Sequence, residues 1–215
     1  MGERGTTRYD PAVDRRIVLA GTAVTLTGLA GCIGGGGGQE VTVTGPTLDP
    51  PVMGDPEADV TVAAYEDYAC QHCKDYNETV VPTLVSEYVE PGTIRYEHHD
   101  FPIPVDPEVS WQAASAARAV QDRAGDEAFW TYSKALFEHQ SELGPEMYAN
   151  LAGEADVPGE EVRTAAVDEA YRPTVQKDRN RGQDAGVSAT PTVLVNGEAV
   201  DRPTVDAIGA AIENA

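Results

Sequence analysis

A pair of cysteines, Cys70 and Cys73, constrains the fold more than any other feature of the sequence. The run before the pair, residues 59–65, is β-branched and apolar and predicts a buried strand. The run after it, residues 74–88, has apolar residues at helical spacing and predicts a helix that Pro82 should kink. The sequence therefore places both thiols where a strand passes into the N-terminus of a helix.

That position favours redox chemistry at the two thiols. Free backbone N–H groups and the helix dipole stabilise a thiolate at a helix N-terminus and can lower a cysteine pKa to about 3.5–7.5. We expect Cys70 to be the exposed, attacking sulfur. Cys73 lies one turn later on the same face and can resolve a mixed disulfide. Zinc sites also use C-x-x-C pairs, but usually with a second ligand pair, and the sequence has no second C-x-x-C.

A second informative run covers residues 186–197 and reads Gly-Val-Ser-Ala-Thr-Pro-Thr-Val-Leu-Val-Asn-Gly. It predicts a loop, a strand and a tight hairpin turn, because Asn-Gly is a strong signal for such a turn. The dipeptide Thr190-Pro191 comes directly before the predicted strand. Cis peptide bonds are almost confined to bonds that precede proline, so this bond is a candidate.

Together these motifs resemble the DsbA-like branch of the thioredoxin superfamily. Residues 54–73, from Gly-Asp-Pro through the predicted strand to the C-x-x-C pair, look like the start of such a domain. So does the Asp-Phe-Pro at 100–102, which follows a second predicted strand over residues 93–98. Residues 189–197 resemble the cis-proline loop and the next strand. The resemblance covers about residues 50–215 and implies a cis bond before Pro191.

The distance between the two motifs selects the branch, because Pro191 comes 118 positions after Cys73. The residues between them read as helical, and the expected helices cover 108–123, 126–140, 145–154, 160–171 and a segment after Pro173. The expected fold class is α/β. It is a thioredoxin fold with a helical insertion at about 106–185, between the second strand and the cis-proline strand.

The resemblance implies roles for individual residues, with the two cysteines as nucleophile and resolving thiol. Gln71 and His72 would tune the redox potential, because they lie beside the Cys70 sulfur. An imidazolium at His72 would stabilise the thiolate and make the disulfide more oxidising. Pro191 would pack against the active site, and the backbone of Thr190 would hydrogen-bond an extended substrate.

Two positions depart from the family pattern. Gln71 stands where many members have proline, so the potential cannot be carried over from relatives. Ala64 stands six residues before the first cysteine, where many members hold a buried carboxylate. Glu66 shares its strand face and is a candidate proton acceptor for Cys73. The commoner outcome for such a residue is a carboxylate on the surface.

The N-terminal residues read as an export signal, with a domain boundary on either side of a tether. Arg15-Arg16 precede an apolar run that is too short to span a bilayer and predict a twin-arginine signal peptide over residues 1–31. The run ends Leu-Ala-Gly-Cys, which resembles a lipobox, so we expect Cys32 to carry lipid. A Gly-rich tether, 32–48, would then hold the domain, 49–215, at the outer face of the cell membrane. A signal-anchor helix with an incidental cysteine is the alternative.

Charge narrows the possible partners. The 36 acidic against 15 basic residues give a net charge of -21, which argues against nucleic-acid binding and against electrostatic adhesion to an anionic membrane. The acidic excess runs along the whole chain and favours adaptation to high salt over a merely acidic protein. The expected function is an exported thiol–disulfide oxidoreductase, an oxidase more than a reductase or isomerase. It would need no cofactor, would act on exported protein thiols, and would be recharged by a membrane or extracellular redox partner.

Two other functions remain open at this point. A copper chaperone would use the cysteine pair with His98 or His99, although adjacent histidines at a strand end are more often surface residues pointing to opposite faces. No bound metal is therefore expected. A redox-inert module would capture extended peptides along the cis-proline face, and its binding would survive the change Cys70→Ser.

Overall fold

The computed structural model describes residues 44–215. The predicted signal peptide, the lipidation site Cys32 and most of the tether lie outside the described residues. Within them, no helix has both the length and the apolar character needed to cross a membrane.

A five-stranded sheet forms the centre of the domain, with the strands in the order β1-β3-β2-β4-β5. Strands β2 and β3 are parallel, and every other neighbouring pair is antiparallel. The strands are β1 (Val52–Gly54), β2 (Val60–Glu66), β3 (Ile94–Asp100), β4 (Thr192–Val195) and β5 (Glu198–Ala199). Both strands expected before and after the C-x-x-C helix are present, and β3 runs two residues further than expected.

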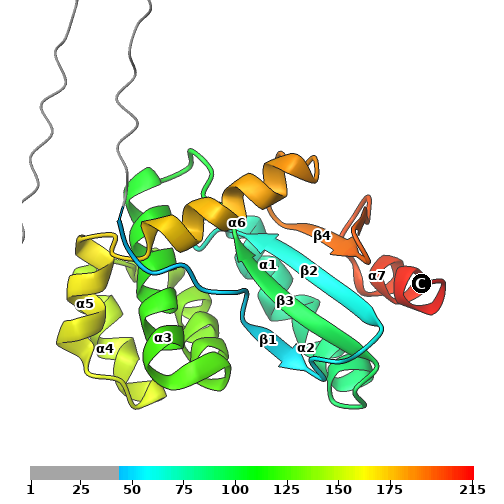
Figure 1. Ribbon diagram of the computed structural model, residues 1–215, viewed down its shortest axis with the longest axis horizontal. Helices are drawn as coiled ribbons and strands as arrows, with labels where there is room; N and C mark the ends of the chain where they lie inside the picture. Colours follow the sequence, from blue (N-terminus) through cyan, green and yellow to red (C-terminus); the bar gives the residue numbers. More distant parts are fainter. Residues whose placement is uncertain (1–43) are drawn as a thin grey trace, which may run out of the picture. The chain divides into compact units, whose positions relative to one another are not determined.

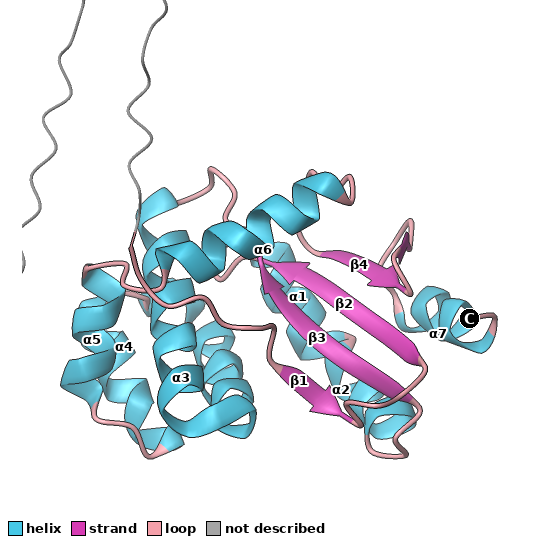
Figure 2. Cartoon of the chain, in the orientation of Figure 1, coloured by secondary structure: helices cyan, strands magenta, loops and turns pink. Residues whose placement is uncertain are grey.

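The described residues form seven α-helices, which lie beside and against the sheet (Figure 1). They are α1 (Gln71–Thr79), α2 (Val81–Leu84), α3 (Pro107–Glu138), α4 (Pro145–Ala152), α5 (Gly159–Val167), α6 (Arg172–Asp184) and α7 (Val205–Glu213). A π-helical turn (Val85–Val89) follows α2, and short 3-10 turns cover Gln140–Glu142 and Gly153–Ala155. Figure 2 shows α3, α4 and α5 gathered on one side of the magenta sheet, with α6 running from them toward the ends of the strands.

The sheet has two packed faces because strand residues alternate in direction. Val62 and Ala64 pack with side chains of α1, α2 and α7, whereas Tyr65 packs on the other face beside Phe101. Helix α6 approaches this second face closely. A Cβ atom at Gly182 would lie only 2.8 Å from the Phe101 ring, so a glycine is required there.

The helical insertion follows the expected pattern. The helices expected over 108–123 and 126–140 are the two limbs of α3, which meet at Gly125. Gly125 has φ 84°, a conformation that interrupts the helix and that glycine adopts readily. Helices α4 and α5 pack on α3 and bury an aromatic and aliphatic core that includes Phe129, Tyr132, Leu136, Phe137, Tyr148 and Val162.

The expected kink after the C-x-x-C pair is also present. Helix α1 ends at Thr79, and α2 begins at Val81 with Pro82 in its first turn. Proline has no N–H to continue the hydrogen-bond ladder of α1, so a new helix starts there.

The second motif forms the predicted hairpin. Asn196 and Gly197 both have positive φ values, of 47° and 88°, as a type I′ turn requires. The bond between Thr190 and Pro191 is cis, as the resemblance implied.

Candidate active site

The two cysteines occupy the start of α1. Cys70 is the N-cap residue, with extended backbone dihedrals, and Cys73 lies in the first turn. The Cys70 carbonyl accepts hydrogen bonds from the N–H groups of Cys73, at 3.0 Å, and Lys74, at 3.2 Å. The two cysteines are free thiols in this structure. The strand–helix junction therefore places them as the sequence predicted.

The expectation that Cys70 is exposed is wrong. Its residue surface is only 5% exposed, and that of Cys73 is fully covered. The cause is the cis-proline loop, which packs on the helix start: the Cys70 thiol donates to the Thr190 carbonyl at 3.5 Å. A loop 120 positions away covers the sulfur, so local sequence could not reveal this burial.

The environment drives the pKa values of the two thiols apart. A hydrogen bond from the Cys73 thiol, with smaller contributions from Thr190 and the N–H groups of Cys73 and His72, lowers the pKa of Cys70 to about 5. Burial, the hydrogen bond to Cys70 and the negative charge of Glu66 raise the pKa of Cys73 well above its usual value. At neutral pH the pair is therefore suited to one thiolate and one thiol.

The other predicted site residues divide between two sides of Cys70. His72, Thr190 and Pro191 line a cavity of about 370 Å³ together with Tyr76. Gln71 faces a different cavity of about 620 Å³, and its side-chain amide donates to Asp75 at 3.0 Å. The structure thus brings His72 beside the cis-proline loop and leaves Gln71 on the side of the helical insertion.

Glu66 is buried, contrary to the surface position that was the commoner expectation. Its residue surface is 2% exposed. The Asn77 side-chain amide donates both to the Glu66 carboxylate and, at 2.9 Å, to the Cys73 carbonyl. One side chain thus ties the carboxylate to the backbone of the second cysteine.

His98 and His99 are also buried rather than on the surface, although they do lie on opposite faces of β3 as strand alternation predicts. His98 lies between Glu66 and Asp100. His99 lies between Glu97 and Asp178. These carboxylates compensate the cost of burying an imidazole. Among residues 44–215, no group of three His, Cys, Asp or Glu side chains is arranged to hold a metal ion.

Arg118 is a central residue of the core that the sequence did not single out. It is 0% exposed, and its guanidinium contacts the carboxylates of Asp100 and Asp178 at 2.6 Å each. Burial alone would raise the pKa of Asp100, but Arg118 and His98 lower it to about 2. An arginine in the Ala-rich run of α3 is the only local signal, because its partners come from other elements.

Two further residues that the sequence did not single out fix the loop around Cys70. The Asp67 carboxylate accepts hydrogen bonds from the N–H groups of Ala69 and Ile103 and from the Ser110 hydroxyl. Burial outweighs these bonds and raises its pKa to about 6. The Gln140 side-chain amide donates to the carbonyls of Tyr68, at 2.8 Å, and Cys70, at 2.9 Å. The helical insertion is therefore tied directly to the N-cap of α1.

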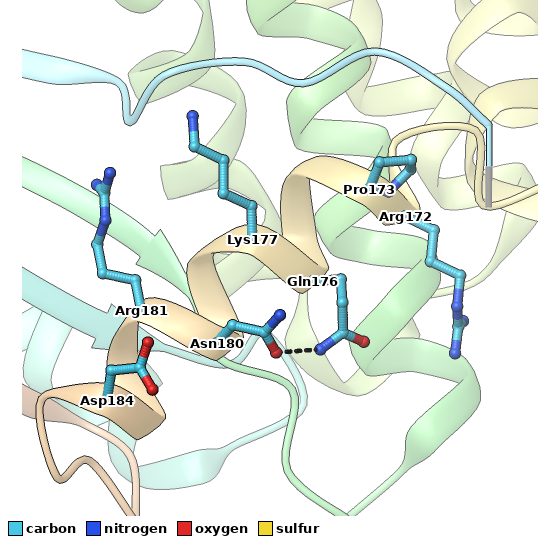
Figure 3. Close-up of a pocket in the computed structure, with 7 residues that line it drawn as sticks. All are labelled: Arg172, Pro173, Gln176, Lys177, Asn180, Arg181 and Asp184. Carbon is cyan, nitrogen blue, oxygen red and sulfur yellow. Dashed lines mark hydrogen bonds between the residues drawn. The ribbon is translucent and has the colours of Figure 1, made fainter. Parts of the chain in front are cut away.

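An open pocket of about 660 Å³ along α6 lies apart from this site (Figure 3). None of the residues that line it belongs to the site above. Two of the cations that line it have local contacts: Lys177 pairs with Asp49, and the Arg172 guanidinium lies 4.0 Å from the centre of the Trp111 ring. We therefore centre the chemistry on the cysteine pair.

Comparisons with known proteins agree with this fold. A family model described as thioredoxin matches residues 47–214. The chain is 27% identical over 156 residues to disulfide bond formation protein D of Bacillus subtilis, covering 70% of this chain and 69% of that protein. It is 31% identical over 165 residues to the Na(+)/H(+) antiporter NhaA 3 of Salinispora tropica, of which it covers only 24%. The crystal structure of oxidised BdbD from Bacillus subtilis matches with a TM-score of 0.71 and 26% identity, over 77% of this chain and 91% of that one.

Proposed function

The chain belongs to the thioredoxin superfamily and, within it, to the DsbA-like protein disulfide oxidoreductases, and from this premise we propose that it is an exported oxidase that donates a Cys70–Cys73 disulfide to protein thiols. The observation that carries the proposed direction is the separation of the two thiol pKa values. A thiolate at Cys70 stabilises the reduced pair, and a stabilised reduced form makes the disulfide a stronger oxidant.

The reaction runs as two exchanges. A substrate thiolate attacks the Cys70 sulfur of the disulfide, the Cys70–Cys73 bond breaks, and Cys73 leaves as a thiolate. A second substrate thiolate then attacks the substrate sulfur of the mixed disulfide and releases Cys70 as a thiolate. The substrate loses two electrons and the cysteine pair gains them. A membrane or extracellular redox partner must then reoxidise the pair.

Glu66 is the proposed proton carrier for Cys73. The raised pKa of Cys73 means that its thiolate takes up a proton on leaving and must lose one before it attacks. The Glu66 carboxylate, linked through Asn77 to the Cys73 backbone, can accept the Cys73 proton when the pair is reoxidised.

The cis-proline loop is the proposed substrate-binding surface. The Thr190 carbonyl lies 3.5 Å from the Cys70 sulfur, so an extended peptide bound to this backbone would bring its own sulfur close to Cys70. Pro191 has no N–H and leaves the hydrogen bonds of this surface to its neighbours. We propose His72, on the same side, as a residue that tunes the potential, with Gln71 on the other side of Cys70.

The test is the reduction potential of the pair, titrated against glutathione in molar salt. The full chain should carry Cys32→Ser so that only the C-x-x-C thiols respond. We expect a value near about -120 mV, as for an oxidant, rather than about -270 mV, as for a reductase. Failure to form a reversible disulfide would contradict the oxidoreductase function, and a value near the lower figure would contradict the oxidase direction only. In dilute salt the same protein should lose folded structure if the net charge of -21 reflects adaptation to high salt.

We also propose that the enzyme acts outside the cytoplasm, held to the membrane by lipid on Cys32. The support is the order of sequence features in residues 1–38: paired arginines, an apolar run, Leu-Ala-Gly-Cys and five glycines. In cells, Cys32→Ser should move the protein from the membrane fraction to the soluble exported fraction. Replacement of Arg15 and Arg16 by lysine should keep it inside. Unchanged membrane association of the Cys32→Ser chain would rule out the lipid anchor.

A further inference from the structure

The proposed proton carrier, Glu66, has one charged side chain beside it in the described structure that could compensate its burial. The His98 Nδ1 atom lies 3.5 Å from a Glu66 carboxylate oxygen, which is an ion-pair distance. The other Glu66 contact comes from the uncharged amide of Asn77. A carboxylate with 2% exposure needs a compensating charge to stay ionised, because burial disfavours the charged form.

His98 is held where it can supply that charge. Asp100, on the same face of β3, lies 3.2 Å from the Nε2 atom of His98, and the Arg118 guanidinium of α3 reaches the His98 carbonyl at 3.5 Å. The aromatic rings of Tyr68, Phe129 and Trp130 surround the imidazole, and its residue surface is 1% exposed. The charged and titratable groups that face His98 are therefore Glu66 of β2, Asp100 of β3, Arg118 of α3 and Tyr68 of the loop before Cys70. Asp178 of α6 is linked to His98 only through Arg118.

Five buried side chains that begin at Glu66 form a chain of contacts in which negative and positive charges alternate. The order is Glu66, His98, Asp100, Arg118 and Asp178, and each neighbouring pair is in contact. Burial alone would lower the pKa of His98, but Asp100 and Glu66 outweigh it and raise the pKa to about 9. His98 is therefore an imidazolium through the neutral range.

We propose that His98 is a positioning residue for the Cys73 half of the reaction: its imidazolium pairs with the Glu66 carboxylate and orients it, so that Glu66 can accept the Cys73 proton. This inference rests on the proposed role of Glu66. The assisted step, in the direction that reoxidises the pair, starts from a mixed disulfide on Cys70. The proton of the Cys73 thiol passes to the Glu66 carboxylate, and the Cys73 thiolate attacks the Cys70 sulfur. The Cys70–Cys73 bond forms, the bond to the partner sulfur breaks, and the partner leaves as a thiolate.

Ala64 explains why a histidine has room beside the site. Ala64 lies directly opposite His98 in the parallel pairing of β2 and β3. It stands where many DsbA-like proteins hold a buried carboxylate, and its small side chain leaves that face open. Glu66 and His98 lie on this same face of the sheet, and the two side chains meet there as an ion pair.

The neighbouring histidine provides a matched control. His99 is as buried as His98, lies one position along the same strand, and likewise sits between two carboxylates, at 3.0 and 3.5 Å. It faces the other side of the sheet and does not contact Glu66. A change at His99 thus removes a comparable buried imidazole without touching the proposed proton carrier.

The experiment follows the two exchange steps separately. Reduced protein carrying Cys32→Ser is mixed with excess oxidised glutathione, quenched with acid, and analysed by mass spectrometry for the glutathione adduct on Cys70. Adduct formation reports the attack by Cys70, and adduct decay reports the attack by Cys73. The variants are His98→Gln, His99→Gln and Glu66→Gln, each measured from pH 5 to pH 10.

For His98→Gln we expect adduct decay to slow about tenfold at pH 7, because general acid–base assistance is worth 10²–10⁴-fold and only part of it depends on His98. Adduct formation should not change. The difference from the parent protein should close above about pH 9, where the parent imidazolium itself loses its proton. His99→Gln should decay at the parent rate, and Glu66→Gln should decay slowly.

Several outcomes would overturn the inference. Equal slowing by both histidine variants, or slowing by the same factor at every pH, would show a merely structural role. Slow decay in Glu66→Gln with normal decay in His98→Gln would refute the inference and leave the proposed role of Glu66 intact. Normal adduct decay in Glu66→Gln would refute both the role of His98 and the proposed role of Glu66. If the histidine variants do not fold, the imidazole of His98 can be titrated by NMR in the parent protein, and a neutral ring at pH 7 would overturn the inference.

Discussion

Replacing Cys73 by serine in the Cys32→Ser chain should stop turnover and leave the protein trapped as a mixed disulfide on Cys70. A serine hydroxyl can replace the Cys73 thiol as hydrogen-bond donor to the Cys70 sulfur, and the contributions of Thr190 and the helix N–H groups remain. Cys70 therefore keeps a lowered pKa and still attacks disulfides. Serine cannot displace the partner bound to Cys70 and re-form the disulfide, because its hydroxyl does not attack a disulfide at this pH. We expect turnover to fall by at least about 10³-fold, as when a covalent catalyst loses one member of its pair. The adduct should be stable to gel electrophoresis without reductant.

The matched control is Cys70→Ser in the same background. Cys73 is fully covered and its pKa is well above the usual value, so this variant should form hardly any adduct. Adducts of equal yield in the two variants would contradict the assignment of Cys70 as the attacking sulfur. Turnover by Cys73→Ser near the rate of the parent protein would contradict the resolving role of Cys73.

Replacing Arg118 by methionine should lower the free energy of unfolding by about 3–5 kcal/mol. The methionine fills similar space but leaves Asp100 and Asp178 buried without their cation. Both carboxylates have 1% exposed side chains, so water cannot replace the guanidinium. Unfolding by guanidinium chloride, followed by circular dichroism, measures the change.

The loss should depend on pH in a defined direction. The pKa of Asp100 is about 2 in the folded protein, below its ordinary value of 3.8, so its ionised form stabilises the fold. This contribution is complete above about pH 4 and disappears as the pH falls through about 2. The difference in free energy of unfolding between the parent protein and Arg118→Met should therefore become smaller as the pH falls from about 4 to about 2. The triple change Arg118→Met, Asp100→Asn and Asp178→Asn should recover part of the loss.

An exposed arginine serves as the control for this experiment. Arg163 pairs with Glu160 one turn earlier on α5, in contact with solvent. Arg163→Met should leave the unfolding midpoint unchanged within error, since exposed ion pairs contribute little. A loss in Arg118→Met no larger than that in Arg163→Met would show that the buried carboxylates find other partners.

Local sequence was sufficient for the parts of the fold that local physics determines. The β-branched run before Cys70 and the helical spacing after Cys73 predict the strand and the helix start. Gly125 separates the two limbs of α3 because glycine readily adopts the positive φ that interrupts the helix there. The hairpin turn at 196–197 follows from its Asn-Gly pair in the same way.

The polar core could not be predicted from local sequence. Glu66 and His98 occur in strands as residues that usually face solvent, and their burial depends on contacts with each other, with Asn77 and with Asp100. Arg118 and Asp178 are 60 positions apart in the chain, so their ion pair depends on how α3 and α6 pack against the sheet. The covered position of Cys70 likewise depends on a distant loop.

The placement of two adjacent histidines on opposite faces of β3 has a consequence for how this gene can change. Shifting a strand by one residue turns every side chain to the other face. A one-residue insertion or deletion carried into β3 would point His99 toward Glu66 and turn Asp100 away from Arg118. Length changes between α2 and β3 must therefore be absorbed in the turn before Ile94. The contacts that His98 and Asp100 make on one face thus fix the register of the whole strand.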